Sequence, residues 1–300
     1  MYIKDCFRDP ARSTFSLELM PCRTPEAAEA LLDRFEASLS RLPDFVSVTH
    51  SLDRLSWTAT LALAARCQER WRVPAMVHLA GRDLRRDELG EYVRAMRDFG
   101  IETVLALRGD VSPERPLRGD FRYASELIEA LRAEDVSLSI AGACYPLGHP
   151  EAIDLGADLQ ALVTKVSAGV DFLVTQLYLD APTYASWHAR VRASGVAVPI
   201  LPGVIAPRDR AHLERLCRFC RMTVDVADDI TFPDAFLALG REALTMQAPG
   251  LHVFTLNQVE AACVYADLFV HHPTQEVSHA SSLPGRSVAS RSHALCDSPL

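Results

Sequence analysis

The sequence of 300 residues has no long apolar run and no block of basic residues. No stretch approaches the roughly 18 apolar residues that a helix needs to span a bilayer. The first ten residues are charged and contain no apolar signal core. The net charge is −8, and only two of the 31 basic residues are lysines, Lys4 and Lys165. We therefore expect a cytoplasmic protein that has neither nucleic acid nor a membrane as its partner.

The sequence also lacks the ligand spacings of common metal sites. Its eight cysteines are scattered along the chain, and the pair Cys217-x-x-Cys220 has no second pair to complete a zinc or redox motif. The spacing of His50, His78 and His149 matches no known ligand pattern. We expect no metal site, and scattered thiols are typical of a reducing compartment.

Strand-like and helix-like segments alternate along the chain. Short apolar runs predict strands at residues 14–20, 44–49, 74–79, 103–107, 137–144, 171–175, 198–201 and 252–256. Apolar residues at helical spacing predict helices at 25–42, 57–71, 87–99, 124–133, 154–168, 182–193, 208–219, 234–247 and 259–270. The alternation predicts an α/β fold, an eight-stranded parallel (β/α)8 barrel of the TIM type. A doubly wound open sheet is the alternative, but no Gly-x-Gly-x-x-Gly follows any strand.

The composition predicts one domain and a tail. With 49% hydrophobic residues the chain can bury a large core, and a single barrel of this length is ordinary. We assign residues 1–272 to one catalytic barrel domain. Residues 273–300 are rich in Ser, His, Pro and Arg without periodicity, which predicts a disordered C-terminal tail.

Polar residues follow the predicted strands at the points where they end. The fourth strand is the clearest case, because the apolar residues 103–107 lead directly into Arg108-Gly109-Asp110. The carboxyl ends of parallel barrel strands converge on one mouth, where active sites of this fold lie. The strand-end residues are Glu18, Thr49-His50, His78, Arg108-Gly109-Asp110, Tyr145, Thr175-Gln176, Pro202-Gly203 and Asn257.

Glu18 is the strongest candidate for acid chemistry. It lies within the apolar run Phe15-Ser-Leu-Glu-Leu-Met20, where a carboxylate is costly unless it is paired or used. Burial would raise its pKa toward neutrality, as suits a general acid. The alternative is a structural ion pair with an arginine.

The other strand-end residues have equally plain alternatives. Asp110 is either a functional carboxylate or a loop anchor, and Gln176 is either a satisfied core amide or a reader of a pterin- or flavin-like edge. His78 ends an apolar strand and is either a core group or a ligand contact. His149 lies in a loop held between two prolines, which makes a rigid platform.

An ordered set of motifs resembles one known family. The motifs are Ser16-Leu-Glu-Leu-Met-Pro21, Phe45-Val-Ser-Val-Thr49, Ala106-Leu-Arg-Gly-Asp110, Tyr145-Pro-x-x-His-Pro-Glu-Ala152, Ala157-Asp-Leu159, Lys165-Val-x-Ala-Gly169, Thr175-Gln-x-x-x-Asp180, Pro202-Gly203 and Thr255-Leu-Asn257. Over about residues 14–269 the chain resembles the catalytic barrel of methylenetetrahydrofolate reductase.

The resemblance implies reduction of 5,10-methylenetetrahydrofolate to 5-methyltetrahydrofolate by NADH or NADPH, through bound FAD. By resemblance, Glu18 is the acid and Asp110 the carboxylate near both rings, while Gln176 and its neighbour Tyr178, with Asp110, contact the substrate. The flavin contacts implied are Thr49, His78, Arg108, Gly109, Asp110, Tyr145, His149, Asp158 and Lys165. A homo-oligomer is also expected.

Several positions depart from the family pattern. The loop after the second strand, His50-Ser-Leu-Asp-Arg54, is bulkier and charged, and Ala161 and Thr164 replace longer polar groups. Residues flanking Glu18 and Gln176 are aliphatic, and Gln258 stands where an arginine is usual. Two alternatives therefore stay open: a flavin-free or altered-substrate paralogue, and a non-catalytic folate- or flavin-binding subunit.

Overall fold

The computed structural model describes residues 2–50, 57–110, 116–222 and 231–271. Within them the strands are β1 (Thr14–Leu19), β2 (Phe45–Val48), β3 (Ala75–Ala80), β4 (Thr103–Leu107), β5 (Ser139–Cys144), β6 (Phe172–Thr175), β7 (Ile200–Leu201), β8 (Gly203–Val204) and β9 (Gly250–Phe254). The α-helices are α1 (Pro25–Ser38), α2 (Trp57–Trp71), α3 (Leu89–Asp98), α4 (Ala124–Glu134), α5 (Leu155–Ser167), α6 (Ala181–Ala193), α7 (Arg210–Phe219), α8 (Asp234–Thr245) and α9 (Val259–His271).

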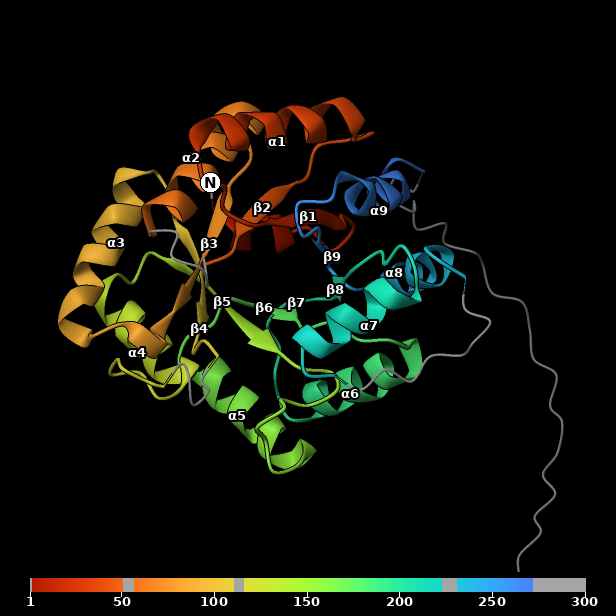
Figure 1. The fold of residues 1–300 in the computed structure, drawn as a ribbon. Helices are drawn as coiled ribbons and strands as arrows, with labels where there is room; N and C mark the ends of the chain where they lie inside the picture. Colours follow the sequence, from red (N-terminus) through yellow and green to blue (C-terminus); the bar gives the residue numbers. More distant parts are fainter. Residues whose placement is uncertain (1, 51–56, 111–115, 223–230, 272–300) are drawn as a thin grey trace, which may run out of the picture.

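The strands form one parallel sheet that closes on itself. Their order is β7-β6-β5-β4-β3-β2-β1-β9-β8, and every pairing is parallel. The helices surround the strands in chain order (Figure 1). The predicted (β/α)8 barrel is confirmed, and the alternative of an open sheet is wrong.

The seventh barrel strand is split into β7 and β8. Pro202 separates them, and proline has no N–H to donate to a sheet. Its carbonyl still accepts the backbone N–H of His252 at 2.9 Å. Thus β7 pairs with β6 and β8 pairs with β9, so that the two halves together complete the barrel.

Some predicted boundaries were too long, for local reasons. The first helix was expected to reach residue 42, but Leu39 has an extended backbone and Pro43 follows soon after. The last strand was expected to reach residue 256 and ends instead at Phe254, because Leu256 and Asn257 adopt left-handed backbone with φ of 49° and 59°. Such residues cannot continue a strand.

A short 3-10 helix, η1 (Ile3–Phe7), closes the amino end of the barrel. The sequence did not predict it. Ile3 is fully buried among side chains from the beginnings of the strands, and the ring of Phe7 lies 5.1 Å from that of Phe172. The carboxyl end of the strands is therefore the end that remains for a ligand.

In the part of the chain that is described, no helix is long and apolar enough to cross a membrane. The predicted tail, residues 273–300, lies outside the described residues, as do residues 51–54 of the charged loop His50-Ser-Leu-Asp-Arg54. The division into barrel and tail, and the cytoplasmic location, stay predictions.

Asp171 holds the strands that carry two predicted site residues. Its carboxylate accepts the backbone N–H of Ile140 at 2.8 Å and a hydrogen bond from Arg132. This joins the starts of β5 and β6. We expect Asp171→Ala to lower the free energy of unfolding by about 2 kcal/mol, because it leaves these donors unpaired. Urea unfolding measures this. Asp98→Ala, at an exposed position, should change it by less than about 0.5 kcal/mol, and an equal effect of both substitutions would contradict the assignment.

Candidate active site at the carboxyl end of the barrel

Glu18 occupies the inner wall near the mouth, and two histidines contact its carboxylate. Oε2 of Glu18 lies 3.5 Å from Nε2 of His78 on β3 and 3.6 Å from Nε2 of His252 on β9. The side chain of Glu18 is 16% exposed. No arginine among the described residues pairs with it, so the partner expected from the sequence is replaced by two imidazoles.

The pKa of Glu18 runs against the sequence expectation. Burial raises it, but a hydrogen bond from His252 and the nearby charges of His78 and His252 outweigh burial, and the pKa is lowered. The prediction of a raised pKa is therefore wrong. Burial can be read from an apolar strand, whereas partners from β3 and β9 cannot.

His78 is almost fully buried and stays neutral at pH 7. Burial lowers its pKa to about 4, with the charge of Glu18 opposing this and His252 and His50 adding to it. Its Nε2 atom also lies 3.2 Å from the Ser47 hydroxyl oxygen. His78 thus contacts the acid candidate directly, in addition to its predicted position beside a cofactor.

Asp110 reaches the rim through a turn that requires glycine. Gly109 has φ of +86°, and a Cβ built there would lie 2.8 Å from the side chain of Arg82. Arg82 in turn donates from Nη1 to the backbone oxygen of Asp110 at 2.9 Å. The carboxylate of Asp110 is exposed at the mouth.

Gln176 lies on the opposite wall and contacts Cys220, the residue after α7. The Cys220 Sγ atom is 3.8 Å from Oε1 of Gln176. The pKa of Cys220 is raised to about 11 by burial, with smaller contributions from Cys217 and from the charges of Glu18 and Asp110. One thiol therefore feels all three residues predicted for the chemistry, and the structure brings them to one mouth.

A second cluster follows β5. Tyr145 and His149 lie edge to face at 4.7 Å, and the Lys165 ammonium is 5.9 Å from the Tyr145 ring and donates to the Ala143 carbonyl oxygen. Burial lowers the pKa of Lys165 and raises that of Asp158. These four predicted residues form one partly buried group.

Arg108 is held beside this cluster by a carboxylate. Its guanidinium makes a two-point ion pair with Glu151 at 2.7 and 2.8 Å, which joins the loops after β4 and β5. Thr49 is fixed by its backbone, which donates to the Leu19 oxygen at 3.0 Å.

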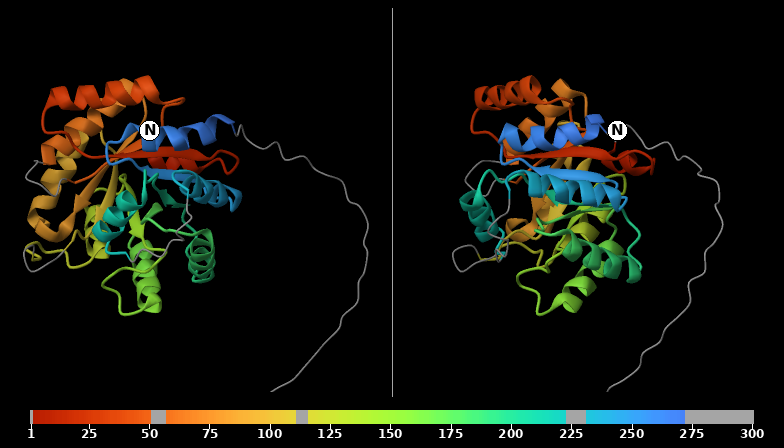
Figure 2. Two further views of the ribbon diagram at one scale, coloured as in Figure 1. Left: turned by 45° about the vertical axis from the view of Figure 1, so that its right-hand side comes forward. Right: turned by 90° about the vertical axis from the view of Figure 1, so that its right-hand side faces the viewer.

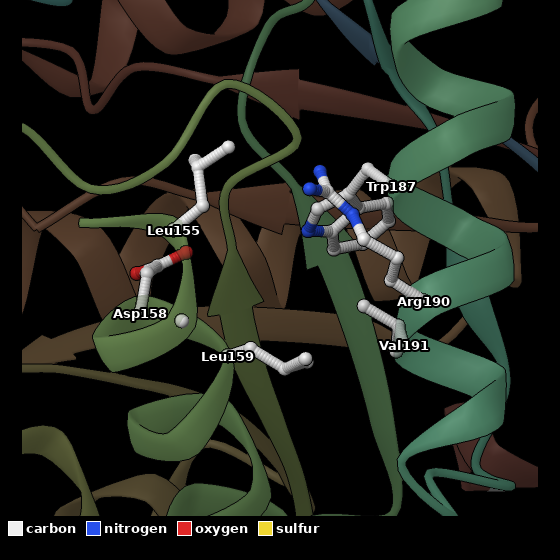
Figure 3. A pocket seen from close by; sticks show the side chains of 7 residues that line it. Leu155, Asp158, Leu159, Trp187, Arg190 and Val191 are labelled. Carbon is white, nitrogen blue, oxygen red and sulfur yellow. The ribbon is translucent and has the colours of Figure 1, made fainter. Parts of the chain in front are cut away.

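Asp158 also lines a small pocket between α5 and α6. Asp158 and Arg190 point into it from opposite sides, above Leu159 and Val191 (Figure 3). Its volume of about 90 Å³ is well below the roughly 300 Å³ of ordinary small-molecule sites. This pocket does not hold a whole nucleotide cofactor.

Tyr178 does not join the mouth. It is 1% exposed, and its ring stacks on that of Tyr184 from α6 at 4.8 Å. The chain turns outward after Gln176, so Tyr178 packs between the sheet and the helices. It therefore offers almost no surface to a ligand.

Three polar residues of the inner wall were missed from the sequence. His252, Ser16 and Ser47 are all fully buried, and they connect to one another beneath Glu18. Ser16 and Glu18 share one face of β1 because they are two residues apart. The polar residues Ser16 and Glu18 alternate with apolar residues in β1, and this pattern could have predicted that Ser16 faces the same way as Glu18.

Together these observations define a closed parallel barrel with an acidic and amide-bearing site at the carboxyl ends of its strands. The profile of the methylenetetrahydrofolate reductase family matches residues 4–232. The chain is 32% identical over 212 residues to 5,10-methylenetetrahydrofolate reductase of Pectobacterium carotovorum, covering 71% of this chain and 69% of that one. It is 30% identical over 229 residues to methylenetetrahydrofolate reductase (NADH) 1 of Zea mays, covering 71% of this chain.

The chain belongs to the methylenetetrahydrofolate reductase family, which confirms the resemblance seen in the sequence. It spans only 38% of the length of the Zea mays relative. Among solved structures, a protein from Clostridium thermocellum described as binding two copies of 5-methyl-5,6,7,8-tetrahydrofolic acid matches with a TM-score of 0.59. That match has 12% identity and covers 87% of this chain and 96% of the other, and it shows the fold alone.

The buried His78 should make folding stability depend on pH. Its pKa is about 4 in the folded protein against 6.5 when unfolded, so the unfolded chain takes up a proton first as the pH falls. The stability is fully present above pH 6.5 and declines toward pH 4, by about 3 kcal/mol at most. We expect urea unfolding of the wild type to show this decline, and His78→Gln to lack it. Parallel curves for the two proteins would contradict the assignment.

Proposed function

We propose that this chain reduces 5,10-methylenetetrahydrofolate to 5-methyltetrahydrofolate with NADH or NADPH as donor, through bound FAD. The observation that carries the proposal is the grouping of Glu18, Asp110 and Gln176 around Cys220 at the barrel mouth. A proton source, a carboxylate and a donor–acceptor amide are what recognition and opening of a pterin-linked ring require. Family membership and the fold shared with a methyltetrahydrofolate-binding protein support the substrate class.

The residues after β5 fit a flavin nucleotide. Lys165 is a buried ammonium whose charge carries a burial cost, and a phosphate beside it would offset that cost. Tyr145 and His149 supply ring surfaces, and Asp158 supplies an acceptor for a hydroxyl. The residues proposed to hold FAD are Thr49, His78, Arg108, Gly109, Asp110, Tyr145, His149, Asp158 and Lys165. When bound there, FAD would supply hydride transfer between the nicotinamide nucleotide and the folate.

Glu18 supplies the proton in this scheme. Opening of the five-membered ring of the substrate frees an amine nitrogen, and the carboxyl of Glu18 donates its proton there. The lowered pKa of the unliganded site keeps Glu18 ionised at pH 7. A bound pterin displaces water from the mouth, and this desolvation raises the pKa toward the value a donor needs.

Gln176 orients the pterin, and Asp110 faces the same space from the opposite loop. The Oε1 atom of Gln176 accepts the backbone N–H of Leu177 at 2.8 Å, which fixes the plane of the amide. Its NH2 group is then set to donate to a ring acceptor.

A spectrum and an activity assay test the proposal. We expect the purified full chain to show flavin absorption and to oxidise NADH or NADPH only when 5,10-methylenetetrahydrofolate is present. A colourless protein with the same activity would instead establish a flavin-free paralogue. A protein that binds folate or flavin without turnover would establish a binding subunit, and both results would overturn the proposal as stated.

Glu18→Gln should lower turnover about 100-fold or more, because it removes the proton donor and keeps the shape of the side chain. The bound flavin should stay at the wild-type level. Glu91→Gln on the exposed face of α3 is the matched control and should leave turnover unchanged. Unchanged turnover in Glu18→Gln would remove this residue from the chemistry.

Gln176→Ala should act mainly on the substrate. We expect KM for the folate to rise about tenfold, since loss of a buried hydrogen-bonding partner costs about 1–2 kcal/mol. Flavin content and reduction of the flavin by the nicotinamide nucleotide should not change. Cys220→Ser, which keeps a small polar group in contact with Gln176, is the control and should have a wild-type KM.

A further inference from the structure

The hydrogen bonds around His252 fix where its protons lie. The Ser16 hydroxyl contacts two atoms, the carbonyl oxygen of Leu251 at 3.0 Å and Nδ1 of His252 at 2.8 Å. A carbonyl oxygen only accepts, so the single hydroxyl proton goes to Leu251. Ser16 must then accept the second bond from Nδ1–H of His252.

The other ring nitrogen of His252 faces the acid candidate. If the ring is neutral, Nε2 carries a lone pair, and that lone pair points at Glu18 Oε2 at 3.6 Å and at the Ser47 oxygen at 3.3 Å. A lone pair facing a carboxylate is repulsive unless a proton lies between them. The Ser47 hydroxyl is shared, because Nε2 of His78 lies 3.2 Å from it as well.

His252 is also sealed from water. It is fully buried, stacks on the ring of Phe45 at 6.1 Å and meets the edge of Phe254 at 5.6 Å. A proton on Nε2 therefore exchanges with solvent by way of the polar neighbours of His252. Among the described residues that contact His252 directly, Glu18 is the one that is both ionisable and partly exposed.

We propose that Glu18 and His252 hold one proton in common, and that His252 is a positioning residue that stores the proton which Glu18 delivers. The inference rests on the proposed function for its catalytic meaning. Before the pterin binds, the shared proton lies on the Nε2 side of the pair, between His252 and the Glu18 carboxylate. When the pterin binds and water leaves, the proton moves from Nε2 to Oε2, which gives a neutral carboxylic acid and a neutral imidazole. Catalytic hydrogen bonds of this kind are often long before the substrate binds.

The charged and titratable groups near the pair come from several elements. His78 from β3 contacts Glu18, His50 after β2 lowers the pKa of His78, and Cys220 after α7 senses the charges of both Glu18 and Asp110. Among the described residues, two uncharged polar groups also contact the ring of His252: the hydroxyls of Ser16 on β1 and Ser47 on β2. No second carboxylate in the described part of the chain contacts the pair, so Glu18 is the group that exchanges the proton.

Nitrogen NMR of the full chain with 15N-labelled histidine tests the pair without any activity. At pH 7 we expect His252 to carry protons on both ring nitrogens. In Glu18→Gln the Nε2 atom should lose its proton while Nδ1–H remains. The His252 signal is identified by its loss in His252→Gln, or by its shift in Ser16→Ala if the first variant does not fold. A neutral ring protonated on Nε2, or a spectrum that Glu18→Gln leaves unchanged, would overturn the proposal.

A pH profile separates storage of the proton from a structural role. Without His252 only Glu18 is left to hold the proton that the reaction needs, so the alkaline fall of kcat/KM in His252→Gln should move down by about one pH unit or more. A merely structural loss would lower kcat/KM equally at every pH, and this result would end the inference. If the wild type reduces no folate, the proposed function fails alone, and the NMR result still decides whether the proton is shared.

Discussion

Closure of the parallel sheet between β8 and β9 is the constraint on which the site depends. It places β9 beside β1, and the register sets Ser16 opposite His252 and Glu18 opposite Phe254. An open sheet would leave β1 or β9 at an edge, with Glu18 facing solvent and no imidazole behind it. The split at Pro202 achieves closure while leaving a short gap in the seventh strand. Figure 2 shows β9, in blue, running beside β1, in red, from two other directions.

Charge is divided between two sides of the mouth. Glu18 and Asp110 supply negative charge near the first and fourth strands, whereas Lys165 and Arg108 supply positive charge around the loop after β5. Arg108 is balanced by Glu151, whereas Lys165 donates to the Ala143 carbonyl oxygen and lies near Asp158, a carboxylate whose own pKa is raised. This division suits a ligand with an anionic part and a ring system that reacts away from it.

The strand ends could be predicted from the sequence because each apolar run stops at the same place where polar residues begin. Three residues each interrupt or follow an apolar run: Glu18, Asp110 and Gln176. Because the strands of the barrel are parallel, their carboxyl ends lie at the same mouth, and these residues come together there. His252 could not be assigned in the same way. Its strand is buried on both faces, so alternation does not tell which side chains point inward. Tyr178 was misplaced because the direction of the chain after a strand is set by packing against α6. The pKa of Glu18 depends on partners that are 60 and 234 residues away in the chain, and no local pattern contains them.

The 3-10 helix η1 limits how ligands can enter the barrel. Ile3 and Phe7 fill the amino end of the barrel, so a ligand reaches the inner wall from the carboxyl end of the strands. Two reactants that both contact the inner wall would then have to enter through the same mouth and bind one after the other. Under the proposed function, the oxidised nicotinamide nucleotide would leave through this mouth before the folate enters it.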